Sequence, residues 1–349
     1  MTSDTRRVGL AIFGVGRMGQ VHLGSILRMT TAHLKYIVED NLQLGQEIAR
    51  KNLVNDEVKV IRSQDDDQVF QDASIEGIII CTPTHLHEGL VRRGLKSAKA
   101  VFCEKPLAGS TEIIEACYKD AEKYNKPLLC AFNRRFDPGL CLMKQRLVQG
   151  EVGEVQCIKR CNRDNPPPTV EFLKMSGGIF QDQGIHDIDA VCWTIGEYPV
   201  SVFTQAHAFR KEIADCDDVD QVIIVMKFPS GCIASIDLSR HAVYGYDQRM
   251  EIFGSKGMLE QQNKAPTSIV HHNESGACKN PIEVSFLQRY GEAYELELQH
   301  FINVVLGIEK EILVKKEEVI QICQITSACE ESYRTGKPIF MSSFQTGAI

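Results

Sequence analysis

The sequence lacks the features that mark membrane proteins and nucleic-acid-binding proteins. No window reaches the apolar length that spans a bilayer, and the first residues, MTSDTRR, lack the apolar segment of a signal peptide. Positive charge is also scarce: 39 Lys and Arg are outnumbered by 46 Asp and Glu, the formal net charge is −7, and no basic stripe offsets it. These absences argue against a membrane protein and against sequence-independent affinity for nucleic acid or anionic lipid.

Cysteine is abundant but lacks the pairing that a disulfide framework or a zinc site needs. The chain has 13 Cys, an odd number, and most lie in apolar runs, where a thiol packs as a small hydrophobic group. Only Cys157 and Cys161 are close together, in a segment that alternates like a strand, and no second Cys/His pair completes a zinc set. We therefore expect reduced thiols, no metal site and a cytoplasmic protein.

The chain has the size and composition of a globular protein with two domains. Its 349 residues exceed what one core usually organises, and 43% hydrophobic with 24% charged residues is an ordinary globular composition. We expect a dinucleotide-binding domain over residues 1–132 and a substrate-binding and oligomerisation domain over residues 133–349.

A glycine motif opens the first domain. The apolar run VGLAIF (8–13) is followed at once by G-V-G-R-M-G and then by a helical pattern. In such a strand–turn–helix context Gly14 allows the tight turn, Gly16 lets the backbone approach a pyrophosphate, and Gly19 lets the helix pack on the strand. The helix N-terminus adds unpaired N–H groups for the phosphates. The motif predicts a dinucleotide site.

Acidic residues end the next strand, LKYIVED, at Glu39 and Asp40. An acid at this tip can accept hydrogen bonds from the adenosine ribose and repels a 2′-phosphate, and no Arg or Lys follows in residues 41–43. We assign Asp40 to the ribose and expect NAD rather than NADP. Two surface acids at a loop are the alternative.

Strands and helices then alternate. Residues 75–82, 100–104 and 127–132 read as buried strands, and 85–95 and 110–124 as helices. This alternation predicts an α/β domain with a doubly wound parallel sheet of the Rossmann type, with ligand at the carboxyl ends of its strands.

Two of these strand ends carry polar groups. One holds Thr82 and Pro83, and the other is Glu104-Lys105-Pro106. His85 and His87, just beyond the first, read more simply as a helix start and a solvated side chain than as ligands.

The second domain reads differently. Strand-like segments at 201–209, 220–228, 232–242 and 247–255 follow one another without helices between them. They predict a C-terminal α+β domain with a largely antiparallel open sheet. Helices are expected at 291–307 and about 317–335.

The stretch SGGIFQDQGIHDID (176–189) places two acids and an imidazole at helical spacing. If the run is helical from Asp182, then Asp182, His186 and Asp189 share one face. The opposite face then packs against a core through Ile185, Ile188 and Cys192. A solvated amphipathic helix is the alternative, but we expect the polar face to line a cleft together with Lys105.

These motifs together resemble the Gfo/Idh/MocA family of oxidoreductases. The resemblance is carried by the glycine motif, the Thr82–His87 segment, E-K-P (104–106) and residues 176–189. Further stretches resemble the inositol 2-dehydrogenases and related cyclitol dehydrogenases of that family, namely FNRRFDP (132–138), NRDNPPP (162–168) and AVYGYDQRMEIFGSKGML (242–259). The matches run from residue 8 to 336.

The resemblance implies roles for residues of this chain. It makes Lys105, Asp182 and His186 the catalytic set, with Gln183-Gly184 a departure from the family's pattern that could alter ring-hydroxyl preference. It also implies a homo-oligomer, dimer or tetramer, by analogy. The implied substrate contacts are Arg135, Arg163, Asp189 and Tyr246, with Asn162 and Asp164 weaker, and the implied cofactor contacts include Arg17, Met18, Thr82, Pro83, His87 and Glu104.

The chemistry of these groups suits oxidation of a secondary alcohol. A histidine is a natural base because its ordinary pKa, about 6.5, lies near working pH, so His186 takes the hydroxyl proton. Asp182 could orient the imidazole or hold the hydroxyl, and Lys105 could stabilise alkoxide character.

The leading prediction is NAD-dependent oxidation of a secondary hydroxyl of myo-inositol or scyllo-inositol to the ketone. A pyranose or anhydrosugar dehydrogenase, an NAD-assisted glycosidase and a non-catalytic NAD-sensing protein are the alternatives. Arg135 and Asp189 could instead pair with each other, and Tyr246 could pack on the sheet.

Overall fold

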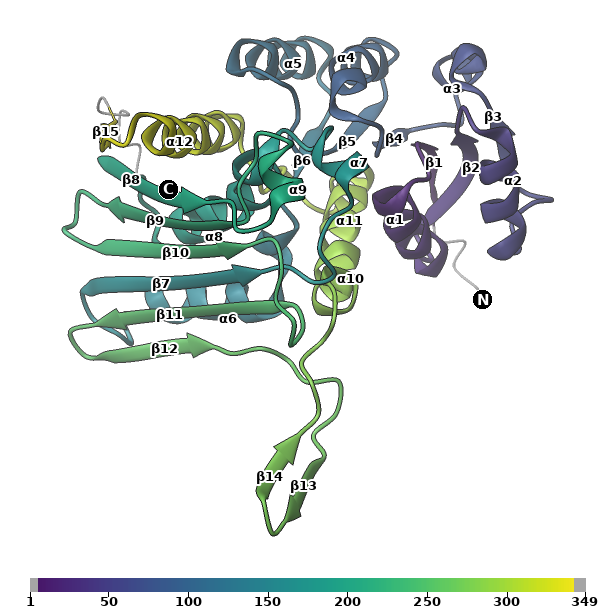
Figure 1. Ribbon diagram of the computed structural model, residues 1–349. Helices are drawn as coiled ribbons and strands as arrows, with labels where there is room; N and C mark the ends of the chain where they lie inside the picture. Colours follow the sequence, from purple (N-terminus) through teal and green to yellow (C-terminus); the bar gives the residue numbers. More distant parts are fainter. Residues whose placement is uncertain (1–5, 342–349) are drawn as a thin grey trace. The chain divides into compact units, whose positions relative to one another are not determined.

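The structure, a computed structural model, describes residues 6–341 (Figure 1). The chain divides into two compact units, Met1–Asn133 with Glu292–Ile320 and Arg134–Gly291 with Gln321–Ile349. The sequence placed the whole of 133–349 in the second domain. Residues 292–320 instead belong to the first unit, because helix α11 (Gly291–Leu306) buries apolar side chains in the core of that unit, namely Leu298, Phe301 and Ile302.

The first unit is built on a six-stranded sheet in which every pair is parallel. The strand order is β3-β2-β1-β4-β5-β6, so the direction of winding reverses between β1 and β4. This confirms the predicted doubly wound sheet and places the expected ligand site beyond the carboxyl ends of β1 and β4. The strands are β1 (Val8–Phe13), β2 (Ala32–Val38), β3 (Lys59–Ile61), β4 (Gly77–Ile80), β5 (Ala100–Glu104) and β6 (Leu128–Ala131).

Helices connect these strands and have clear local causes. The predicted helix at 110–124 is α5 (Thr111–Tyr124): the Ser110 hydroxyl accepts from the Ile113 N–H at 3.4 Å at its start, and Asn125 ends it at φ 50°. The remaining helices of this unit are α1 (Arg17–Arg28), α2 (Leu42–Lys51), α3 (Asp67–Gln71) and α4 (His87–Lys96), with 3-10 turns η1 (Ser63–Asp65) and η2 (Thr84–Leu86).

The second unit contains a seven-stranded sheet of order β12-β11-β7-β10-β9-β8-β15. All of its neighbours are antiparallel except β7 and β10, which run parallel, so the predicted largely antiparallel sheet is confirmed. The strands are β7 (Val155–Arg163), β8 (Ser201–His207), β9 (Gln221–Lys227), β10 (Ile233–Ser239), β11 (Asp247–Gly254), β12 (Gly257–Gln261) and β15 (Ile339–Phe340).

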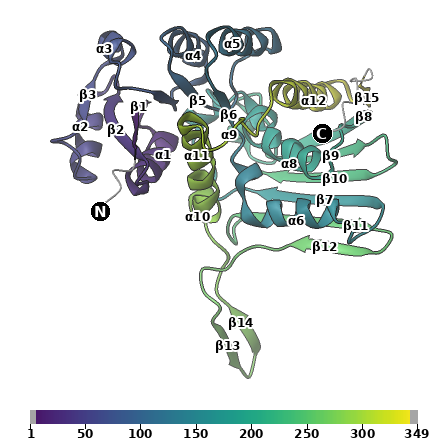
Figure 2. The ribbon, with the colours of Figure 1, turned by 180° about the vertical axis from the view of Figure 1, so that it is seen from behind.

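One face of this sheet is covered by helices and the other is open. Along β9, buried residues alternate with exposed ones, as expected for a strand packed on one side only. Helices α6 (Pro138–Val148) and α8 (Ile185–Ile195) lie on the covered side (Figure 2). The other helices of the unit are α7 (Val170–Leu173), α9 (Lys211–Ala214), α10 (Phe286–Arg289) and, for most of its length, α12 (Lys316–Thr335).

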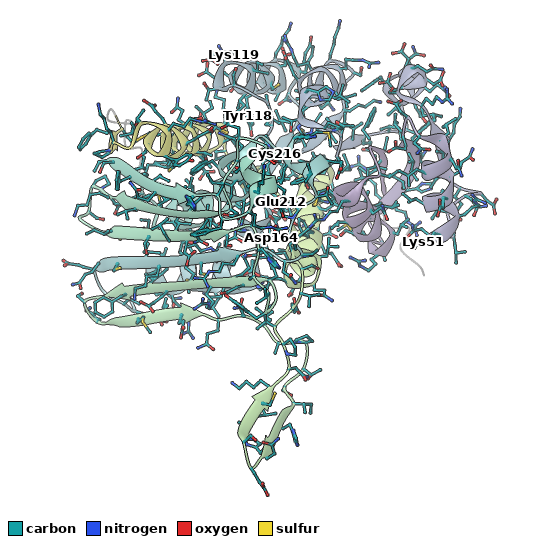
Figure 3. All side chains as sticks on the ribbon, viewed as in Figure 1. Lys51, Tyr118, Lys119, Asp164, Glu212 and Cys216 are labelled. Atoms are coloured by element: carbon teal, nitrogen blue, oxygen red, sulfur yellow. The ribbon has the colours of Figure 1, made fainter. Side chains whose placement is uncertain are left out.

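A β-hairpin projects from the second unit between β12 and α10. It consists of β13 (Val270–Asn273) and β14 (Gly276–Lys279), and its side chains are almost all exposed (Figure 3). Across residues 6–341, no helix has the length and apolar character that crossing a membrane requires.

Candidate active site

The glycine loop between β1 and α1 has the geometry that dinucleotide binding requires. Gly14 adopts φ +81°, and a Cβ there would lie 2.9 Å from the Cys81 carbonyl oxygen. A Cβ on Gly19 would lie 2.0 Å from the Gly14 carbonyl oxygen, so only glycine lets the helix approach the strand. Gly16, by contrast, has open space where a Cβ would project. The close contacts lie inside the fold, and the open side is available to a ligand.

The start of α1 has the features of an anion-binding helix N-terminus. Gly16 caps the helix without a side-chain hydrogen bond, and no acidic residue lies in the first turn. The exposed Arg17 and the half-buried Met18 follow directly. A pyrophosphate is the kind of group that such a helix start binds, so these residues fit the predicted cofactor.

Of the two acids after β2, Glu39 and not Asp40 contacts the glycine loop. The Glu39 carboxylate accepts from the Val15 N–H and from the Asn41 N–H, both at 3.1 Å. The Asp40 carboxylate accepts from the N–H and hydroxyl of Ser63, at 3.0 and 2.5 Å, and these bonds lower its pKa. Asp40 is therefore engaged by Ser63, whereas Glu39 lies next to the glycine loop, and Glu39 becomes the better candidate for the ribose.

The loop after β4 is joined to the loop after β5 by a buried histidine. The ring nitrogens of His87 lie 2.8 Å from the Thr82 carbonyl oxygen and 2.9 Å from that of Pro106. His87 is 1% exposed, so the expectation of a solvated side chain is wrong, whereas His85 is exposed. With both ring nitrogens engaged by backbone, His87 fixes the shape of these loops rather than reaching a ligand.

A buried hydroxyl remains at the same strand end. Thr82 Oγ1 is buried and has no hydrogen-bond partner among the described residues, and the exposed Pro83 follows it. An unsatisfied buried hydroxyl costs free energy unless a ligand or water meets it. Thr82 therefore remains a cofactor candidate.

Glu104, at the end of β5, ties the glycine-loop helix to Lys105. One carboxylate oxygen lies 2.7 Å from Nε2 of His22 on α1, and the other accepts from the Lys105 N–H at 3.2 Å. His22 is fully buried, with its ring edge-on to Phe102 at 4.8 Å. Glu104 thus holds the backbone of Lys105, whose side chain is half-buried.

The helix expected from Asp182 onward is only partly α-helical. Asp182 lies in a π-helical turn (Phe180–Gly184), and the α-helix α8 begins at Ile185, so His186 follows Asp182 across the junction of the two. Asp182 and His186 are both partly exposed. The face predicted to pack inward does so, since Ile185, Ile188 and Cys192 are at most 1% exposed.

Asp189 does not share the exposure of Asp182 and His186. It is fully buried and accepts from Arg135, with Nη2 2.6 Å from Oδ1. Arg135 is buried as well. The prediction that these two residues contact substrate is replaced by the alternative, an internal ion pair.

Arg163 lies on the other side of the sheet from its neighbour Asn162. Adjacent residues of a strand point to opposite faces, and Asn162 is buried while Arg163 is not. Arg163 donates to Asp237 at 2.5 Å and to the Tyr244 hydroxyl at 3.0 Å. Its predicted substrate contact is therefore withdrawn.

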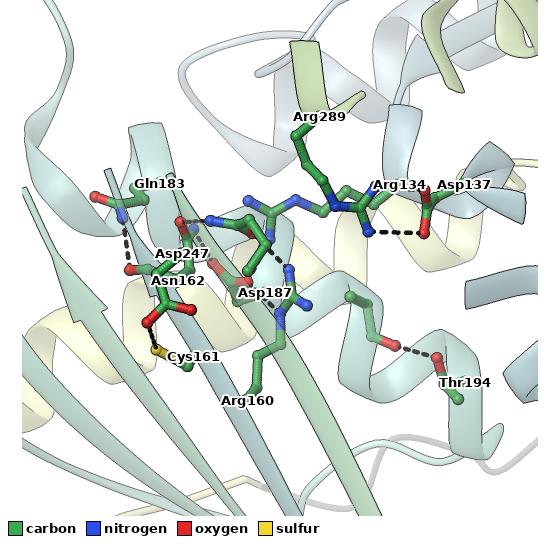
Figure 4. Close-up of polar contacts among 12 residues, drawn as sticks. Arg134, Asp137, Arg160, Cys161, Asn162, Gln183, Asp187, Thr194, Asp247 and Arg289 are labelled. Carbon is green, nitrogen blue, oxygen red and sulfur yellow. Dashed lines mark hydrogen bonds and ion pairs between the residues drawn. The ribbon is translucent and has the colours of Figure 1, made fainter. Parts of the chain in front are cut away.

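Asn162 belongs to a buried polar network centred on Asp187, which the sequence did not single out (Figure 4). One oxygen of Asp187 accepts from Arg134 and from Arg160, the latter at 2.7 Å, and the other accepts from Asn162 at 2.5 Å. Gln183, next to Asp182, donates to the backbone carbonyls of Asn162 (2.9 Å) and Ser239 (3.1 Å). Gln183 is thus engaged by the ends of β7 and β10.

Tyr246 lies at the edge of this network. Its ring packs edge-on to Tyr290 with centroids 6.1 Å apart, and only 6% of the residue is exposed. Burial raises its pKa, against the opposing effect of the Arg134 charge. The ring is packed inside the unit, as the alternative to a substrate contact predicted. The raised pKa keeps the Tyr246 hydroxyl neutral, so it can donate a hydrogen bond to a substrate. Asp164, the other weak candidate, is half-buried and accepts from the Asn165 N–H at 2.9 Å.

Arg240 is a second residue that the sequence did not single out. Its guanidinium donates to Asp182 at 2.6 Å and to Asp218 at 2.8 Å. An arginine just after a strand carries no local signal of such a role, so only the structure reveals it.

Comparison with known proteins gives consistent results along most of the chain. Residues 8–132 match the oxidoreductase family with an NAD-binding Rossmann fold, and residues 141–260 match the GFO/IDH/MocA C-terminal domain. An inositol 2-dehydrogenase of Rhizobium meliloti is 37% identical over 85% of this chain and 88% of its own length. A myo-inositol 2-dehydrogenase of Thermotoga maritima is 33% identical over 85% and 87%.

Solved structures agree with these matches. A myo-inositol dehydrogenase from Corynebacterium glutamicum superposes with a TM-score of 0.88 at 32% identity, covering 97% of this chain and 100% of that one. A scyllo-inositol dehydrogenase from Lactobacillus casei with bound NAD(H) and scyllo-inositol gives a TM-score of 0.88 at 25% identity over 97% and 100%. The chain therefore belongs to the GFO/IDH/MocA family of oxidoreductases with an NAD-binding Rossmann fold.

Proposed function

We propose that this protein oxidises a secondary hydroxyl of a cyclitol, myo-inositol or scyllo-inositol, to the ketone with NAD. The observation that carries the proposal is that Asp182 and His186, four residues apart, are both partly exposed, in a chain with an intact dinucleotide loop and a lysine at the carboxyl end of β5. The relatives named as inositol 2-dehydrogenases support the choice of a cyclitol over other alcohols.

The residues of the first unit suit the cofactor. The N–H groups at the start of α1 would hold the pyrophosphate, and Glu39 would accept hydrogen bonds from the adenosine ribose. Thr82 Oγ1 would bind another polar group of the cofactor. NAD, when bound, supplies the acceptor for the hydride that leaves the ring carbon. The protein has to orient the substrate and take its hydroxyl proton.

His186 takes that proton as general base, since its imidazole is partly exposed at the start of α8. Asp182, whose carboxylate is bonded to Arg240, stabilises the imidazolium that forms. Lys105, fixed through its backbone by Glu104, donates to the same hydroxyl and stabilises its alkoxide character. Tyr246 is the remaining candidate for a ring hydroxyl.

We further propose a homo-oligomer, dimer or tetramer, and a cytoplasmic location. The open face of the seven-stranded sheet supports the first, because Ile223, Val225 and Ile233 are each at least 40% exposed there. Thirteen free thiols support the second.

The test is NADH formation at 340 nm from NAD or NADP with inositol isomers, glucose, xylose and levoglucosan. We expect turnover with a cyclitol and NAD, abolished by His186→Ala and retained by His33→Ala, which removes an exposed histidine on β2. Turnover with a pyranose alone would move the substrate class. Cleavage of a glycoside without net NADH would replace dehydrogenation by NAD-assisted hydrolysis.

A further inference from the structure

Arg240 places one fully buried guanidinium between two carboxylates. It directly follows β10, and its Nη1 lies 2.6 Å from Asp182 Oδ2 while its Nη2 lies 2.8 Å from Asp218 Oδ2. The Arg240 side chain is 0% exposed, and that of Asp182 is 21% exposed. Burial lowers the pKa of Arg240, but the charges of the two aspartates outweigh it and raise the pKa overall, so the guanidinium stays charged. Asp182 thus contacts a fixed, buried cation while part of its side chain remains exposed.

Asp218 connects the same guanidinium to the backbone that leads into Asp182. Its Oδ1 accepts from the Ile179 N–H at 2.9 Å, and Ile179 is the N-cap of the π-helical turn. The chain reaches this point through Gly177 and Gly178, both in the left-handed region at φ 77° and 86°. The turn is therefore held at its start by Asp218 and at its acid by Arg240. The ion pair between Arg240 and Asp218 links these two contacts.

We propose that Arg240 and Asp218 are positioning residues for the oxidation: they hold the Asp182 carboxylate ionised and fixed, which leaves His186 as the proton acceptor. The proposal rests on the proposed function. A guanidinium at hydrogen-bond distance stabilises the charged carboxylate and so makes it a weaker proton acceptor. The substrate proton then goes to the imidazole, and the fixed carboxylate stabilises the imidazolium. A displacement of about 1 Å in such a group can cost about 100-fold in rate.

A purely structural role is the competing explanation, since a buried ion pair also affects folding. Arg289 provides the matched control. It is equally buried and donates through Nη1 and Nη2 to Asp137, at 2.8 and 3.3 Å, in the same unit. Arg289→Met should lose thermal stability as Arg240→Met does. Its kcat should stay near that of the wild type, because Asp137 lies outside the proposed catalytic set.

The experiment measures kcat, KM, NADH affinity and thermal stability for Arg240→Met, Arg240→Lys, Asp218→Asn and Arg289→Met. We expect Arg240→Met to lower kcat about 100-fold and Asp218→Asn about 10-fold, with NADH affinity within about threefold of the wild type. Arg240→Lys keeps a cation but cannot reach both carboxylates as the two guanidinium nitrogens do, so it should recover only part of the loss in kcat. An Arg289→Met variant with the same loss of kcat, or an Arg240→Met variant with unchanged kcat, would overturn the positioning role.

A double-mutant cycle tests whether Arg240 acts through Asp182. In an Asp182→Asn background, Arg240→Met should change kcat by less than about threefold, because the group it positions is already altered. Additive losses would refute the proposal. Wild-type protein without cyclitol turnover would instead count against the proposed function, and the cycle is then run on whichever substrate of the panel is oxidised.

Hydrogen exchange provides a readout that needs no turnover. Amides of residues 176–186 should exchange faster in Arg240→Met and Asp218→Asn than in the wild type and in Arg289→Met. Unchanged exchange in both variants would show that the ion pair does not hold this turn. Because Asp218→Asn preserves the shape of the side chain, it covers the case in which Arg240→Met fails to fold.

Discussion

Arg135 and Asp189 form an ion pair in which Nη2 lies 2.6 Å from Oδ1 and Nε lies 3.1 Å from both carboxylate oxygens. Both side chains are 1% exposed. The residues come from the segment after β6 and from the middle of α8, so the pair fastens that helix within the second unit. Removing either partner of such a buried pair leaves the other charge buried and uncompensated, which strongly lowers the free energy of unfolding.

Arg135→Met is expected to lower the free energy of unfolding by about 3–5 kcal/mol, since it leaves the Asp189 carboxylate buried without this partner. Urea denaturation followed by circular dichroism measures the loss. Arg163→Met is the control: its partner Asp237 is partly exposed, and the expected cost is about 1 kcal/mol or less. A raised KM for cyclitol with unchanged stability would instead return Arg135 to the substrate site.

Glu39→Ala is expected to weaken NADH binding about 10- to 100-fold, because hydrogen bonds to a charged group contribute about 1.5–3 kcal/mol. The relative affinity for NADPH should rise, since the charge that repels a 2′-phosphate is gone. Asp40→Ala is the control, as that carboxylate is bonded to Ser63, and it should change NADH affinity less than about threefold. Fluorescence titration measures NADH affinity in both variants. A larger loss of NADH affinity in Asp40→Ala than in Glu39→Ala would assign the ribose to Asp40.

Substitutions of Gly16 and Gly19, two glycines of the same motif, should have different effects. Gly19→Ala forces a Cβ to within 2.0 Å of the Gly14 carbonyl oxygen and should cost about 1–3 kcal/mol of stability through displaced backbone. Gly16→Ala meets open space, so its melting temperature should stay within a few degrees of the wild type while NADH binding falls. Thermal unfolding and NADH titration of the pair separate the effects. Equal NADH affinity in Gly16→Ala and the wild type would exclude close approach of the cofactor at that position.

Periodicity and motif spacing were sufficient to predict the scaffold. Short buried runs such as 100–104 indicate strands when turn residues flank them, and the glycine motif has few structural solutions because a Cβ is excluded at Gly14 and Gly19. The inward face of α8 followed for the same reason, since Ile185, Ile188 and Cys192 could only be buried together. Local sequence carries these features because local sterics and burial decide them.

The pairing of charges could not be predicted in this way. Whether Asp182 is bonded to Arg240 or Asp189 to Arg135 depends on which elements meet in space, and several arginines were available to each acid. The difference between Glu39 and Asp40 is one residue at the end of a strand, where a single step reverses the direction of the side chain. The π-helical turn at Asp182 likewise has no periodic signature, because it lasts only five residues.

His87 should make the protein less stable as the pH falls below about 6.5. Burial lowers its pKa below the ordinary value of about 6.5, against the opposing effect of hydrogen bonds to the carbonyl oxygens of Thr82 and Pro106. The unfolded chain then binds the proton more readily than the folded one. The contribution of His87 is therefore complete above about pH 6.5 and is lost as the pH falls toward its folded pKa.

Urea midpoints at pH 7.5, 6.5 and 5.5 measure this dependence. His87→Gln, which cannot titrate, should show a smaller loss between pH 7.5 and 5.5 than the wild type, and the exposed His85→Gln should keep the wild-type slope. If instead the wild type gains stability on acidification and His87→Gln removes that gain, the two carbonyl oxygens outweigh burial. His87 would then be a buried imidazolium that clamps the loops after β4 and β5 by donating from both ring nitrogens.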